Sequence, residues 1–217
     1  MRAGGAYRLW QGFLAEESGA AMVEFAIVSA VFFLAWFQLL GFGLFASDNL
    51  MAEKATQLAA RLAVARPAAC TGVPDRILTS GISPAPRFGT NCRAAANTCT
   101  AVATVTCAGA TTNATANEIW TRIDPMLPSN VVISDLQFTY VFDAKLGYLG
   151  GPYTPMVTVD LTMPSIDNTD SPALFSLFRV ISALAQNAGG GAGFNPPQYR
   201  VISISLPAED LNSGTGG

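Results

Sequence analysis

The chain has 217 residues, of which half are hydrophobic and only 12% are charged, and its formal net charge is −3. Soluble domains usually contain about a quarter charged residues, so this composition suits one soluble domain plus an apolar anchor. The absence of histidine removes the commonest general base and the commonest metal ligand. With only two lysines and no basic patch, the sequence argues against nucleic-acid binding.

The apolar excess is concentrated near the N-terminus, in residues 20–45, AAMVEFAIVSAVFFLAWFQLLGFGLF. A helix needs about 20 apolar residues to cross the hydrocarbon core of a bilayer, so this segment predicts a transmembrane helix. Its only charge is Glu24. A carboxylate inside such a span costs about 2.5–3.5 kcal/mol on insertion scales, so we expect Glu24 to have a partner and a function. The simpler alternative is an ordinary signal anchor.

A short polar segment, residues 1–19, precedes the span and ends in glycine. Cleavage after Gly19 would make Ala20 the first residue of the mature chain, with Glu24 fifth and Phe25 sixth. Glycine, four apolar residues and a Glu-Phe pair resemble the prepilin-peptidase signature of the type IV pilin superfamily. The Glu-aromatic pair is similar to that of the Flp/Tad branch.

The resemblance extends over roughly residues 13–65. The EFAIV run, the apolar stretch after it and the later AAR at 59–61 are similar to the TadE-like family. This resemblance implies that a membrane-embedded prepilin peptidase cuts after Gly19 on the cytoplasmic side. It also implies that Glu24, with Phe25 beside it, neutralises the N-terminal amine of a neighbouring subunit. Pairing of the two charges would offset much of the cost of burying them.

The function expected from the resemblance is that of a minor pseudopilin, without enzymatic activity, that assembles a Tad/Flp-type pilus or a related secretion filament. The expected partners are other pilin or pseudopilin subunits, the pilus assembly machinery, the prepilin peptidase and the inner membrane. The subtype (TadE, TadF or TadG) and incorporation into an extracellular pilus stay open. The alternative is a membrane-tethered periplasmic binding module with an uncleaved signal anchor.

No proline interrupts the chain between residue 20 and Pro67, which predicts one continuous helix from about 20 to 66. A break at 47–49, Ser-Asp-Asn, is the alternative, because such residues also cap helix starts. In the second half of the helix, apolar residues recur at alternating four- and three-residue steps and predict one buried stripe. The predicted stripe consists of Met51, Ala55, Leu58, Leu62 and Ala65.

Four cysteines follow the helix: Cys70, Cys92, Cys99 and Cys107. Their spacing does not match zinc-ribbon patterns, so we expect two disulfides and an oxidising compartment, which is the periplasm in a bacterium. If residues 101–107 form a strand, Cys99 and Cys107 would lie about 26 Å apart, too far to pair. Of the three connectivities, we prefer Cys92–Cys99 with Cys70–Cys107, without settling the choice.

The remainder is expected to form an α+β head with a mostly antiparallel sheet of about four strands and two helices. Alternating apolar residues predict strands at 131–142 and 156–163, joined by a turn-rich connection, and further strands at 101–107 and 201–206. Helices are expected at 113–123, stopped by Pro125, and at 171–187, started by Ser171-Pro172. A short helical turn is expected near 75–78.

The head has no recognisable nucleophile–base set, and no cofactor or metal is expected. Asp167 and Asp170 could form a calcium loop, but their spacing misses the EF-hand pattern, so a solvated loop is preferred. The protein is expected in the bacterial inner membrane as a single-pass protein with a periplasmic head. The expected organisation is a leader at 1–19, the span at 20–45, an amphipathic stalk helix at 46–66, the head at 67–207 and a disordered tail at 208–217.

Overall fold

The structure is a computed structural model that describes residues 17–164, 187, 198–209 and 211. The described residues divide into two compact units. The first holds residues 17–45 and residue 187, and the second holds the others.

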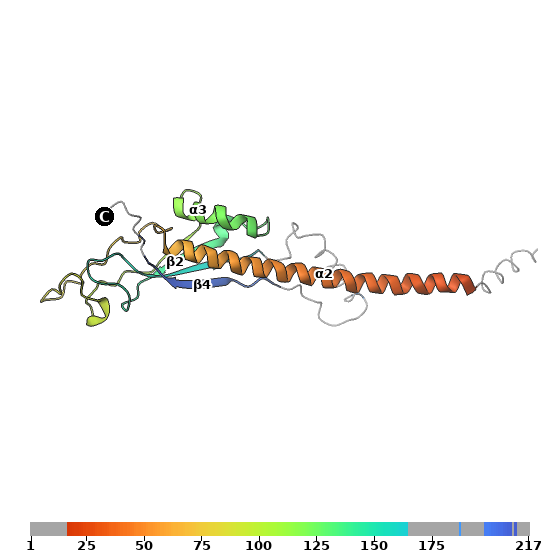
Figure 1. Cartoon of the computed structure of the whole chain (residues 1–217), viewed down its shortest axis with the longest axis horizontal. Helices are drawn as coiled ribbons and strands as arrows, with labels where there is room; N and C mark the ends of the chain where they lie inside the picture. The colour runs from red at the N-terminus through yellow and green to blue at the C-terminus, as the bar shows by residue number, and fades with distance from the viewer. Residues whose placement is uncertain (1–16, 165–186, 188–197, 210, 212–217) are drawn as a thin grey trace, which may run out of the picture. The chain divides into compact units, whose positions relative to one another are not determined.

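One helix, α2, runs without a break from Glu17 to Val64 (Figure 1). The continuous helix is therefore confirmed, and the alternative of a break at 47–49 is wrong. In the first unit nearly all of its large apolar side chains are exposed. Aromatic rings four residues apart lie along the same side of the helix. The ring centroids of Phe32 and Trp36 are 6.3 Å apart, and those of Phe33 and Phe37 are 6.2 Å apart.

The second unit contains a four-stranded antiparallel sheet in the order β1-β2-β3-β4. The strands are β1 (Val105–Ala108), β2 (Leu136–Val141), β3 (Met156–Leu161) and β4 (Ile202–Pro207). The expected fold class is confirmed: a long N-terminal apolar helix is followed by an α+β head with this sheet. The second head helix expected at 171–187 falls almost entirely outside the described residues, as do Asp167 and Asp170.

Alternating side chains decide the two faces of the sheet. On β2 and β3, Leu136, Phe138 and Val159 are fully buried, while their neighbours along each strand are partly or fully exposed. The outward face carries a row of hydroxyl side chains that are opposite one another across all four strands. The row consists of Thr106, Thr139, Thr158 and Ser205. The sheet therefore buries one face and leaves the other polar.

The buried face of α2 differs from the predicted stripe. In the second unit, the helix contributes small side chains to the same core cluster as the sheet: Ala52, Ala55, Thr56, Ala59, Ala60 and Ala63, followed by the larger Val64. Met51 is instead 48% exposed, Leu58 and Leu62 are half-buried, and Ala65 is exposed. The predicted stripe is confirmed at Ala55, and Leu58 and Leu62 pack half-buried against the core, so the prediction is wrong only for the exposed Met51 and Ala65. The fully buried positions of α2 are small because small side chains let a helix backbone approach its neighbours closely.

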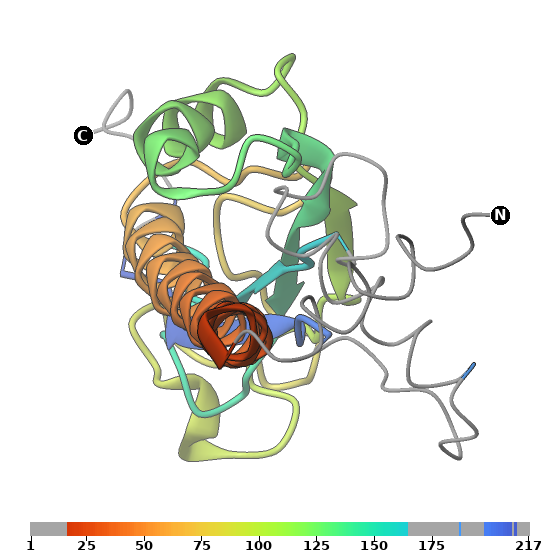
Figure 2. The ribbon, with the colours of Figure 1, turned by 90° about the vertical axis from the view of Figure 1, so that its right-hand side faces the viewer.

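A second helix, α3 (Ala114–Ile123), begins where predicted, with the Asn113 side chain accepting a hydrogen bond from the amide of Ala116 at 2.9 Å. Figures 1 and 2 show α3 near the C-terminal end of α2. There Arg66 pairs with Glu118 at 2.9 Å. A short 3₁₀ turn, η2 (Asp124–Met126), follows at Pro125.

Other predicted boundaries shift. Residues 131–135 are not strand, because the Asp135 carboxylate accepts a hydrogen bond from the Val132 amide and closes a 3₁₀ turn, η3 (Ile133–Asp135). The helical turn expected near 75–78 is absent, and Arg76 instead forms an isolated β-bridge with Pro152. Another short 3₁₀ turn, η1 (Cys92–Ala94), lies further along the chain. After β4, the Ala208 amide donates to the Pro155 carbonyl.

Candidate functional site

The four residues that the sequence assigns to processing and assembly all lie in the first nine residues of α2. Gly19 is exposed, and no atom lies within 4 Å of the position that a Cβ would occupy. Ala20 follows it in the helix. Glu24 is exposed, and Phe25 beside it is 73% exposed. Among the described residues, Gly19, Glu24 and Phe25 are thus open to another molecule.

Glu24 has no charged neighbour on its own helix face. The residues one turn away on either side, Ala20 and Ala21 before it and Ile27 and Val28 after it, are all apolar. In the part of the chain that the structure describes, no cation forms an ion pair with Glu24. An ion-pair partner for this carboxylate is therefore not found among the described residues.

The apolar part of α2 is long and apolar enough to cross a membrane, by length and composition. Only 6% of its most apolar 18-residue stretch is buried within the protein. A core helix of a soluble protein would be mostly buried, and this one is not.

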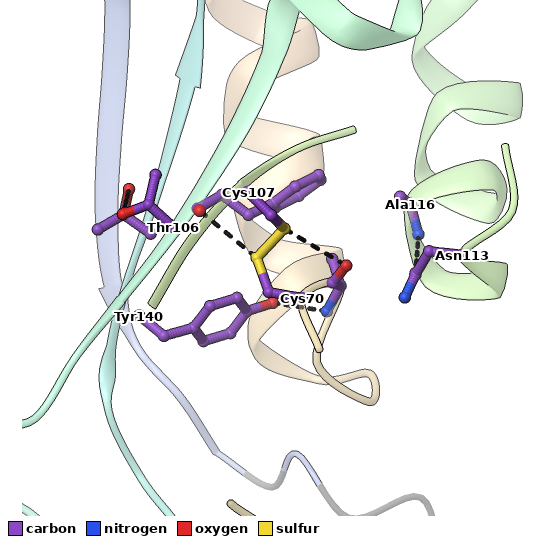
Figure 3. The surroundings of a disulfide bond; sticks show 9 residues. Cys70, Thr106, Cys107, Asn113, Ala116 and Tyr140 are labelled. Atoms are coloured by element: carbon purple, nitrogen blue, oxygen red, sulfur yellow. Dashed lines mark hydrogen bonds between the residues drawn. A yellow bond between two sulfur atoms is a disulfide. The ribbon is translucent and has the colours of Figure 1, made fainter. Parts of the chain in front are cut away.

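A disulfide links the chain just after α2 to strand β1 (Figure 3). The Cα atoms of Cys70 and Cys107 are 5.7 Å apart. Beside the bond, the Ala69 amide donates to the Tyr140 hydroxyl at 2.9 Å. Burial raises the pKa of Tyr140, and this hydrogen bond opposes the rise. The disulfide and the tyrosine together fix the exit of the helix against β1 and β2.

The second disulfide, Cys92–Cys99, closes a short loop with its Cα atoms 5.2 Å apart. The two bonds are the pairing preferred from the sequence, and that preference is confirmed. No three His, Cys, Asp or Glu side chains within the described ranges lie close enough together to hold a metal ion.

A contact between Asp48 and Tyr199 was missed by the sequence analysis. The Tyr199 hydroxyl donates to the Asp48 carboxylate at 3.2 Å, although 151 positions separate the two residues. Burial, then the Asp48 charge and this hydrogen bond, raise the pKa of Tyr199 to about 12. The contact ties the chain that leads into β4 to α2. The polar Ser-Asp-Asn sequence at the end of the apolar run was the only sequence signal for this contact, and it did not identify Tyr199 as the partner of Asp48.

Comparison with known proteins gives one match. No curated protein and no solved structure matches the chain. A TadE-like segment on a membrane-capable N-terminal helix fits a Tad pilus-related, membrane-anchored protein. The TadE-like family itself is not known as enzymatic. The matching family model is that of the TadE-like proteins, over residues 19–61, and it is the family that the sequence motifs predict.

Proposed function

We propose that this protein is a minor pseudopilin that helps to assemble a Tad/Flp-type pilus or a related secretion filament. The observation that carries the proposal is Glu24. It is an exposed carboxylate, the only charged residue of the apolar span 20–45, inside the segment that matches the TadE-like family. Because an unpaired charge in a bilayer is costly, such a residue points to a partner.

The proposed partner is the N-terminal amine of a neighbouring subunit. A prepilin peptidase would cut between Gly19 and Ala20 and create an α-amino group four residues before Glu24, about 6 Å along the helix axis. Two neighbouring subunits can place amine against carboxylate only at one axial stagger. The pair would therefore select the register between subunits as well as offset the cost of burying each charge.

The rest of the molecule supports a rigid head on this helix. The alanine face of α2 shares its core with the sheet, and Cys70–Cys107 fastens the helix exit to β1. The two disulfides favour an oxidising compartment, which supports a head in the periplasm and a single span in the inner membrane. The other proposed partners are pilin subunits and the pilus assembly machinery.

Processing is tested by intact-mass and N-terminal analysis of the protein isolated from its native membrane. We expect a mature chain that starts at Ala20. A chain that starts at Met1 would support the alternative, a periplasmic binding module on an uncleaved anchor. A start near Asp48 would indicate ordinary secretion and would remove any role for Glu24.

The role of Glu24 is tested by pilus assembly in cells that carry Glu24→Ala or Glu24→Gln. Both substitutions should abolish or strongly reduce assembly, since each removes the charge. Gln38→Ala is the matched control, because Gln38 is polar but uncharged and lies in the same span. Normal assembly by the processed Glu24→Ala protein would refute the proposed charge pair while leaving processing intact.

A further inference from the structure

Two loop segments of the head form an ordered substructure, which we call the loop lobe, residues 75–99 and 143–153. Its middle stretch, 147–153, forms backbone hydrogen bonds with 75–77 on one side and with 89–92 on the other. These bonds include Gly150 N to Ile77 O at 2.9 Å and Leu149 N to Thr90 O at 2.8 Å. The Cys92–Cys99 disulfide adds a covalent link within the 75–99 segment of the lobe. The lobe is thus a fixed scaffold beyond the end of β2 and the start of β3.

Exposed aromatic rings lie on this scaffold. Phe88 is 83% exposed and Tyr148 is 49% exposed. Each ring rests on a glycine: a Cβ at Gly150 would collide with the Phe88 ring, and a Cβ at Gly151 would collide with the Tyr148 ring. Gly150 also has φ of +81°, a conformation that side chains disfavour. The two rings therefore lie against adjacent backbone positions, cover no core and are available to a binding partner.

The loop lobe is also cationic. It carries Arg76, Arg87, Arg93 and Lys145 against Asp75 and Asp143, a net charge of +2 in a chain of net charge −3. All four cationic residues are exposed, and none of them forms an ion pair with a described residue. Arg87 directly precedes Phe88 in the chain, and both side chains are exposed.

We propose that the loop lobe binds an acidic polysaccharide. The apolar face of a sugar ring stacks on an exposed aromatic ring, and a sugar carboxylate pairs with guanidinium groups beside it. Rings held on glycine backbone suit such flat stacking. The proposal is independent of peptidase processing and of Glu24.

The test measures binding of the full-length protein, purified in detergent, to polygalacturonate by isothermal titration calorimetry. We expect binding that weakens as salt is raised, because the carboxylate–arginine contacts are screened. Dextran, which has sugar rings without charge, and polyglutamate, which has charge without sugar rings, should each bind at least about tenfold more weakly.

Substitutions assign the binding to the lobe. Phe88→Ala should weaken binding about tenfold, as expected when one aromatic contact is lost. Arg87→Gln should weaken binding and reduce its salt dependence. The matched controls are Val132→Ala and Arg200→Gln, an exposed apolar residue and an exposed cation outside the lobe, and each should change binding less than twofold.

A third variant tests the seating of the ring. Gly150→Ala keeps Phe88 but displaces its ring, so it should weaken binding as much as Phe88→Ala, with circular dichroism to verify the fold. If Gly150→Ala does not fold, the binding of Phe88→Ala and Arg87→Gln to polygalacturonate tests the proposal without it. No binding to polygalacturonate at low salt, equal binding to polyglutamate, or unchanged binding by Phe88→Ala would each overturn the proposal.

Discussion

Removal of the Cys70–Cys107 disulfide should destabilise the head more than removal of Cys92–Cys99. A disulfide stabilises largely by restricting the unfolded chain, and the effect grows with the closed loop. Cys70 and Cys107 are 37 positions apart, which gives about 3.8 kcal/mol from loop-closure entropy. Cys92 and Cys99 are 7 positions apart, which gives about 2.4 kcal/mol.

The assay is urea unfolding of the full chain in detergent, followed by the fluorescence of Trp120, with Trp10 and Trp36 replaced by phenylalanine. Trp120 is half-buried on α3 and reports on the head. With a urea slope near 2 kcal/mol per M, Cys70→Ala/Cys107→Ala should lower the midpoint by about 2 M. The control pair, Cys92→Ala/Cys99→Ala, should lower it by about 1 M.

The decisive comparison is which of the two double variants lowers the urea midpoint more. Cys70 and Cys92 are both buried, so the cost of an altered core is similar in kind for the two pairs. An equal or larger loss from Cys92→Ala/Cys99→Ala would refute the loop-closure reasoning. It would indicate that the loop lobe, and not the helix exit, limits the stability of the head.

Other predictions concern single contacts. Ala59→Leu should lower the unfolding free energy by about 1–3 kcal/mol in the same assay, because Ala59 is fully buried on the close-packed face of α2. The control Met51→Leu, at an exposed position, should change the unfolding free energy by less than about 0.5 kcal/mol. Asn113→Ala should cost about 1 kcal/mol through loss of the cap on α3, with a smaller loss for Asn113→Asp. Tyr199 has its pKa raised to about 12, so its contribution to folding stability should be constant below pH 10 and be lost between pH 10 and 12. Tyr199→Phe should therefore reduce the fall in stability over that range, and an unchanged fall would exclude Tyr199 as a cause of it.

Patterns that depend on neighbouring positions could be predicted well from the sequence. Alternation at Leu136, Phe138 and Tyr140 identified β2, and the proline-free run identified the continuous α2. Asn113 identified the start of α3. Each of these signals is local, because period and capping act within a few residues.

Features that depend on distant partners could not be predicted in the same way. The stripe predicted for α2 included the buried Ala55 and the half-buried Leu58 and Leu62, but it missed most of the alanines that face the core. Periodicity alone did not indicate that close packing favours alanine on this face. Likewise, nothing in the sequence near Asp48 identifies Tyr199 as its partner. Glu24 and Phe25 lie exposed on α2, and the partner that we propose for Glu24 belongs to another molecule.

The order of segments along the chain has a mechanical consequence. The loop lobe begins at residue 75, soon after α2 ends at Val64, and Phe88 precedes every strand of the sheet. A pulling force applied at Phe88 and resisted at the membrane would pass through the backbone between residues 64 and 88, without loading any strand end to end. The Cys70–Cys107 bond would share that tension covalently with β1. The sheet could therefore stay folded under a load that stretched the connection to the lobe.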